Sequence, residues 1–237
     1  MQQVIAFISG KGGMGKTALC AAIAGALAKT GQKVLCIDCD SGTGDLSHYL
    51  GLAESQNLTY SDVALGHYAL DSATAHPDFP GLRFLDAPSG REPLDHAAFA
   101  ALLRQAKQRF DYILLDAPPL QIQADAWLLV TQADPAAIGG ARYMADLLEL
   151  QGAQNLRLLV NAIDRKEMSA LLLTVDDVMD QTGLPLLGIL PRDSALKLAA
   201  AQGKHILTYT KKGASAAVLR IADRLQGKHV TIPSRVI

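Results

Sequence analysis

The amino-acid sequence predicts an α/β fold: a three-layer, doubly wound and mostly parallel sheet with helices on both faces. Short apolar runs alternate with stretches of helical period along most of the chain, as in successive strand–helix units. Hydrophobic residues make up 49% of the sequence and aromatic residues only 5%, a balance that suits Ala/Leu helices over a Val/Ile/Leu sheet. A glycine-rich loop between the first apolar run and the first helical period is the third observation.

The chain has 237 residues, enough to bury a large core in one domain, and no linker, charge block or repeat divides it. We expect one domain over residues 1–227 and a C-terminal tail over residues 228–237. A net charge of −1 gives no overall attraction to DNA or anionic lipid. Three unpaired cysteines and the lack of a signal peptide or membrane span predict a cytoplasmic protein. Peripheral contact with the inner face of the plasma membrane stays open.

The glycine-rich loop follows a predicted strand at residues 4–8. Gly10, Gly15, Lys16 and Thr17 match G-x-x-x-x-G-K-[ST], the phosphate-binding loop. Polyphosphate needs many backbone N–H donors, which a glycine-rich chain and a helix N-terminus supply. Lys16 is expected to bridge the β- and γ-phosphates and Thr17 to bind magnesium. An ordinary Gly-rich turn is the alternative, but the strand–loop–helix context favours the nucleotide site. The nucleotide-binding residues expected here are Gly10, Lys11, Gly12, Gly13, Met14, Gly15, Lys16, Thr17 and Ala18.

The remaining elements follow in order along the chain. The first helix is expected to place Leu19, Ile23, Ala26 and Leu27 on one face and to stop at Gly31. Further strands are expected at residues 33–38, 82–86, 112–116, 127–130, 156–161 and 184–190. Further helices are expected at residues 95–110, 136–150, 168–182 and 213–226, with a short one near 59–65.

Polar residues end three of the predicted strands. Asp38 and Asp40 follow the second strand, Asp116 closes an apolar run, and Asn161 closes another. The carboxyl ends of parallel strands form the ligand-binding edge of such sheets. Because magnesium prefers oxygen ligands, Thr17 and nearby carboxylates are expected to form its site.

The loop sequence SGKGGMGKT carries a second lysine, Lys11, and resembles the deviant Walker A loop of the MinD/ParA family of ATPases. Four further stretches resemble motifs of that family, and together the resemblance covers most of the chain. They are VLCIDCDSGTGDLSHYLGL, FDYILLDAPP, LLVNAID and LPLLGILPRD. The resemblance implies the P-loop NTPase fold of the MinD-like (SIMIBI) class.

The resemblance also implies ATP as the nucleotide, Mg²⁺ as the cofactor and a homodimer when ATP is bound. Lys11 would reach the nucleotide of the partner subunit, while Lys16 and Asp40 complete the implied catalytic set, with Asp40 positioning water. The implied magnesium site consists of Thr17, Asp38 and Asp116. Nucleotide contacts are further implied for Asn161, at adenine, and for Pro191, Arg192 and Asp193, over the base. Hydrolysis is expected to be slow without an activating or target protein.

Within this family the sequence most resembles the MinD branch, which places the division septum. The tail is partly basic and apolar, but Pro233 and its β-branched residues oppose a membrane-binding helix. A weak membrane contact would therefore arise only in the dimer.

Several alternatives stay open. A ParA-type partition ATPase would bind DNA nonspecifically through exposed basic residues. The candidates for that surface are Lys204, Lys211, Lys212, Arg220, Arg224 and Lys228. A metal-cluster or metal-insertion ATPase would need interface thiols, whereas Cys36 and Cys39 are expected to be core residues facing opposite sides of a strand. A flagellar-number regulator of the same family and a non-hydrolysing nucleotide-binding scaffold are the others.

Overall fold

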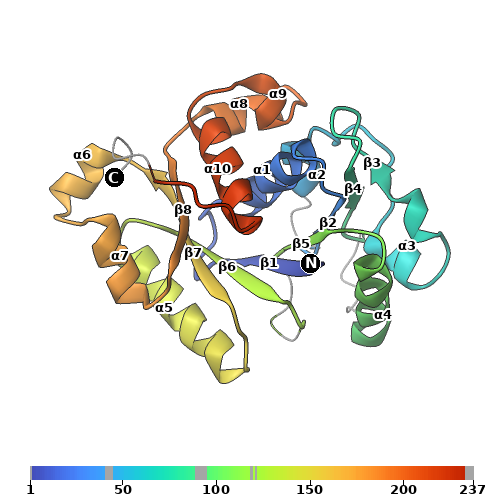
Figure 1. Ribbon diagram of the computed structural model, residues 1–237, viewed down its shortest axis with the longest axis horizontal. Helices are drawn as coiled ribbons and strands as arrows, with labels where there is room; N and C mark the ends of the chain where they lie inside the picture. The colour runs from blue at the N-terminus through green and yellow to red at the C-terminus, as the bar shows by residue number, and fades with distance from the viewer. Residues whose placement is uncertain (1, 41–44, 89–94, 118–119, 121, 233–237) are drawn as a thin grey trace.

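In the computed structural model, the described part of the protein folds around an eight-stranded sheet that helices cover on both faces (Figure 1). The structure describes residues 2–40, 45–88, 95–117, 120 and 122–232. The strand order is β3-β4-β2-β5-β1-β6-β7-β8, and every pairing is parallel except that of β3 with β4. The strands are β1 (Gln3–Ile8), β2 (Val34–Asp38), β3 (Thr74–Ala75), β4 (Leu82–Leu85), β5 (Tyr112–Asp116), β6 (Ala126–Gln132), β7 (Leu156–Ile163) and β8 (Leu186–Pro191). The predicted α/β class is thereby confirmed.

The helices divide between the two faces according to the core they share. One core contains residues of α1 (Lys16–Lys29), α2 (Leu46–Leu50), α8 (Ala195–Ala201), α9 (Ile206–Tyr209) and α10 (Ala214–Leu225). The opposite face carries two cores, which contain residues of α3 (Tyr60–Ala64), α4 (His96–Lys107), α5 (Pro135–Leu150), α6 (Arg165–Ala170) and α7 (Val175–Thr182). A single 3-10 turn, η1 (Leu70–Ser72), precedes β3.

Helix α1 is buried on all sides, and not only on the face that carries Leu19, Ile23, Ala26 and Leu27. Every residue from Ala18 to Ala28 is buried, because the sheet lies on one side and α2, α9 and α10 lie on the others. Small residues allow this close packing. A β-carbon on Gly25 would lie 2.4 Å from the ring of His205, which bonds the carbonyl oxygen of Ala21.

The C-terminal half departs from the prediction in two places. The helix expected over residues 168–182 is two helices, because the chain turns through Leu172 in the left-handed region and restarts at Thr174. Thr174 and Asp177 form a capping box there, which is the local signal for a new helix. Helices α8 and α9 were not predicted, since both are short and lack a clear apolar period.

The segment after α10 packs on the domain as far as the structure describes it. The guanidinium group of Arg224 donates to the carbonyl oxygens of Val230 and Leu187, and Ile232 packs against the core under α6 and α7. Within the described residues, no helix has the length and apolar character needed to cross a bilayer. Residues 233–237 of the predicted tail lie outside the described residues, as does most of the turn after Asp40.

Candidate functional site

The glycine-rich loop joins β1 to α1 at the carboxyl edge of the sheet (Figure 1). Gly13 and Gly15 have φ values of 78° and 93°, which favour glycine over other residues. No side chain caps the N-terminus of α1, and its first turn holds no acidic residue. The free N–H groups and the helix dipole therefore offer a site for an anion.

The first glycine of the loop lies directly against helix α5. A β-carbon on Gly10 would lie 2.1 Å from the carbonyl carbon and oxygen of Gly140, so only glycine fits. The side-chain stem of Lys11 passes the same point, 3.4 Å from where a β-carbon on Gly140 would be. Lys11 itself is exposed, as a residue that meets another subunit must be, and its role stays a prediction.

Asp38 and Asp116 face each other across the adjacent ends of β2 and β5. The two are register partners, and each is only 1% exposed. Burial raises the pKa of Asp38 to about 7, and the neighbouring Asp116 adds to the shift. The backbone N–H groups of Asp40 and Leu46, at 2.8 and 3.4 Å from its oxygens, act in the opposite direction.

Asp116 is a buried carboxylate at the end of β5. Both of its oxygens are buried, and neither accepts a hydrogen bond of ordinary geometry from a described residue. Burial raises its pKa to about 6, although the nearby Lys16 ammonium and Thr17 hydroxyl act to lower it. Such a carboxylate is costly unless a cation compensates it. The residues present therefore fit Mg²⁺, with Thr17, Asp38 and Asp116 as the oxygen groups that would hold it.

Asp40 is half-buried and lies near enough to Asp116 to raise the pKa of that carboxyl. It lies just after Asp38 at the end of β2, which is the neighbour of β5 in the sheet. The position is compatible with a role in orienting water, which stays a prediction because residues 41–44 lie outside the described part of the chain.

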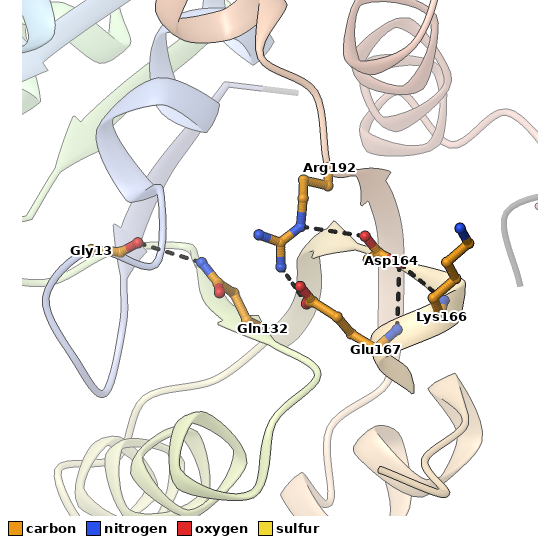
Figure 2. Close-up of polar contacts among 6 residues, drawn as sticks. All are labelled: Gly13, Gln132, Asp164, Lys166, Glu167 and Arg192. Carbon is orange, nitrogen blue, oxygen red and sulfur yellow. Dashed lines mark hydrogen bonds and ion pairs between the residues drawn. The ribbon is translucent and has the colours of Figure 1, made fainter. Parts of the chain in front are cut away.

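Asn161 lies under the phosphate-binding loop. Its side-chain Nδ2 donates to the carbonyl oxygen of Met14 at 2.8 Å, and a β-carbon on Gly15 would lie 2.3 Å from the same nitrogen. Gln132, which the sequence analysis missed, approaches the carbonyl oxygen of Gly13 at 3.5 Å (Figure 2). The available signal was that Gln132 is a polar residue just after the predicted strand 127–130, as Asn161 is the polar residue that closes the predicted strand 156–161. Contact of Asn161 with adenine stays a prediction.

The stretch Pro191–Arg192–Asp193 contacts four elements of the structure. Pro191 ends β8, and Arg192 pairs with Glu167 and, at 3.8 Å, with Asp164 of the α6 N-terminus (Figure 2). The carboxylate of Asp193 accepts hydrogen bonds of 2.9 Å from the backbone N–H groups of Ala195 and Ala214. These bonds order the segment that enters α8 and α10, and the expected base contacts stay predictions.

The positions of the three cysteines test the alternative of a metal-cluster ATPase, which would need thiols at an interface. The sulfur atoms of Cys20 and Cys36 lie 3.7 Å apart in the core, a pairing that the sequence did not reveal, while Cys39 packs on the opposite side of the sheet. Within the described ranges, no group of three or more His, Cys, Asp and Glu side chains is arranged to hold a metal ion.

The chain is similar in sequence and in structure to known nucleotide-binding proteins. The family model of the CobQ/CobB/MinD/ParA nucleotide binding domain matches residues 5–206. The septum site-determining protein MinD of Synechocystis sp. is 32% identical over 244 residues, covering 97% of this chain and 91% of that protein. The MinC:MinD cell division protein complex of Aquifex aeolicus contains a chain that superposes with a TM-score of 0.89 at 30% identity, covering 98% of both chains. MinD of Pyrococcus horikoshii, complexed with Mg-ADP, superposes with a TM-score of 0.79 at 24% identity over 95% of this chain and 96% of that chain, a likeness of fold alone.

Proposed function

Because this chain belongs to the MinD/ParA family of nucleotide-binding domains, we propose that it is a MinD-like ATPase that hydrolyses ATP to ADP and phosphate with Mg²⁺. The observation that carries the proposal is Asp116. Its two buried oxygens accept no hydrogen bond of ordinary geometry from a described residue and lie near Lys16 and Thr17 of the phosphate-binding loop. Its pKa is raised although Lys16 and Thr17 act to lower it, so it is a carboxylate that a bound cation would stabilise.

The proposed mechanism is mainly one of positioning. The loop N–H groups and the α1 N-terminus hold the phosphates, and Lys16 neutralises charge on the β- and γ-phosphoryl oxygens. Thr17, Asp38 and Asp116 would hold Mg²⁺, which when bound would supply further neutralisation of the triphosphate. Asp40 orients the attacking water in line with the leaving group.

Lys11 supplies the link between hydrolysis and dimerisation in this proposal. It is an exposed residue of the phosphate-binding loop, so a second ATP-loaded chain can approach it. There it would stabilise charge in trans, as an arginine finger does, which makes ATP a dimerisation switch. The Aquifex aeolicus relative forms a complex with MinC, which supports a protein partner for this chain in division-site placement or related spatial regulation.

The proposal is tested with the Asp40→Ala variant in ATP and Mg²⁺, with Asp180→Ala, an exposed carboxylate on α7, as the control. We expect Asp40→Ala to accumulate as an ATP-bound dimer by light scattering, while the control hydrolyses ATP and returns to monomer. Wild-type turnover in Asp40→Ala would contradict the assigned role.

The trapped dimer also decides the branch of the family. It is sedimented with anionic vesicles and, separately, titrated with nonspecific duplex DNA at low salt. Lipid binding supports the MinD-like role. DNA binding without lipid binding moves the assignment to the ParA-type alternative, and a dimer that binds neither is a switch whose target is another protein.

A further inference from the structure

Two amide side chains hold the phosphate-binding loop from beneath. Gln132, the last residue of β6, and Asn161, two residues before the end of β7, are register partners. The Nε2 of Gln132 lies 3.5 Å from the carbonyl oxygen of Gly13, and the Nδ2 of Asn161 lies 2.8 Å from that of Met14 (Figure 2 shows the first contact). Successive carbonyl groups of the loop therefore face successive strands of the sheet.

The local backbone is built around the second contact. Asn161 is 8% exposed, and the following residue, Ala162, has a φ of 54°, which is strained for a non-glycine residue. The register of β7 against β8 is interrupted at the same place, between Val160 and Ile163. On the loop side, Gly15 leaves the space that the Asn161 amide fills. Strand and loop thus both depart from regular geometry where they meet.

The orientation of these carbonyl groups fixes the orientation of N–H groups. In a trans peptide the C=O of one residue and the N–H of the next point in opposite directions. Holding the carbonyl groups of Gly13 and Met14 against the sheet therefore turns the N–H groups of Met14 and Gly15 away from it. Those two N–H groups are among the donors that a phosphate cradle requires.

We propose that Gln132 and Asn161 are positioning residues that preset the Met14 and Gly15 N–H groups toward the phosphates before nucleotide binds. The inference rests on the proposed ATP site and adds the source of its pre-organisation. In this inference the Asn161 amide affects how tightly the triphosphate part of any nucleotide binds. A contact with the base would instead affect only nucleotides that carry that base. Asn161 has the larger share, because its contact is the shorter.

The test uses Asn161→Asp and Gln132→Glu, which keep side-chain shape but replace the donor by an oxygen facing a carbonyl oxygen. Gln154→Glu, on an exposed residue at the opposite edge of the sheet, is the matched control. Dissociation constants are measured by calorimetry for ATP, GTP and inorganic tripolyphosphate, each with Mg²⁺. Backbone ¹⁵N order parameters of Met14 and Gly15 are measured without nucleotide.

We expect Asn161→Asp to raise the dissociation constants of all three ligands by the same factor, about tenfold or more, and to lower the order parameters of Met14 and Gly15. Gln132→Glu should weaken binding of the three ligands and lower the order parameters to a smaller extent. If Asn161→Asp does not fold, the measurements on Gln132→Glu test the proposal. A loss confined to ATP, with tripolyphosphate affinity retained, would overturn the proposal in favour of base contact, as would unchanged affinities in both variants. A wild-type protein that binds none of the ligands would refute the proposed ATP site, while the order parameters would still decide the role of the amides.

Discussion

Gly10 of the phosphate-binding loop packs against Gly140 of α5 so closely that a β-carbon on Gly10 would lie 2.1 Å from the Gly140 carbonyl group. The reverse contact is looser, because a β-carbon on Gly140 would lie 3.3 Å from the Gly10 oxygen. The loop and α5 are therefore in backbone contact, and the same methyl group should have different effects on the two sides.

Gly10→Ala should destabilise the protein by about 2–3 kcal/mol and strongly weaken nucleotide binding, because backbone must move to relieve the overlap. Gly140→Ala should change the free energy of unfolding by less than about 1 kcal/mol. The higher helix propensity of alanine stabilises α5, while the close contact of the new β-carbon with the Gly10 oxygen destabilises it by a similar amount. Urea denaturation and nucleotide titration of both variants measure this. Equal effects of the two substitutions would show that the close approach is not maintained in solution.

Asp116→Asn should stabilise the nucleotide-free protein at pH 7, on the order of 2 kcal/mol, and abolish Mg²⁺-dependent hydrolysis. The folded pKa of Asp116 is raised from 3.8 to about 6, so the stability that its protonated form contributes is lost as pH rises through about 6. A neutral amide avoids that loss. The measurement compares the free energies of unfolding at pH 7 with and without Mg²⁺ and nucleotide. A less stable variant would indicate that Lys16 and Thr17 compensate the Asp116 charge more than burial penalises it in the free protein.

His205 should make the protein sensitive to acid. Its Nε2 donates to the Ala21 carbonyl oxygen at 2.9 Å and its Nδ1 accepts from the Leu207 N–H, so the neutral ring is the form that fits. Burial lowers its pKa from 6.5 to about 4, and the nearby His76 adds to this. The contribution of the neutral ring to the free energy of unfolding is fully present above pH 6.5 and is lost as pH falls toward 4. The loss at pH 5 is about 2 kcal/mol.

The measurement is the difference in unfolding free energy between pH 7 and pH 5 for wild type and His205→Gln. The variant should be less stable at pH 7 but lose less on acidification. His67→Gln, at an exposed histidine, is the control and should behave as wild type. Equal losses in wild type and His205→Gln would mean that His205 does not titrate in this range.

The two lysines of the loop should separate binding from catalysis. Lys16→Ala should lose ATP binding, because Lys16 is the cation expected at the phosphates. Lys11→Ala should bind ATP as a monomer and hydrolyse it at least about a hundredfold more slowly, since Lys11 is proposed to act across the dimer. Lys29→Ala, at an exposed position near the end of α1, is the control. Calorimetry, light scattering and phosphate release measure the three properties. Normal dimerisation and turnover by Lys11→Ala would refute its role in trans.

The sequence was sufficient where local pattern and topology agree. Runs such as YILLD in β5 are apolar along their whole length, as strands covered on both faces are, so the strand and its terminal Asp116 were predicted correctly. Asp95 was recognised as a helix cap, and the four residues predicted to face inward from α4 are its buried ones: Phe99, Leu102, Leu103 and Ala106. The glycine-rich loop was recognisable because phosphate binding requires particular residues at fixed spacing.

Pairings between distant segments came only from the tertiary structure. Contact of Cys20 with Cys36, of Gly10 with Gly140, and of Asn161 with Met14 depends on which strands become neighbours and how helices lie across them. The sequence thus determined the fold class, the loop and the acids at the strand ends, because these follow from short-range periodicity and spacing. Packing decided the burial of α1 on all sides and the amide contacts under the loop, because both depend on segments that are far apart in the chain and meet only when the sheet has formed.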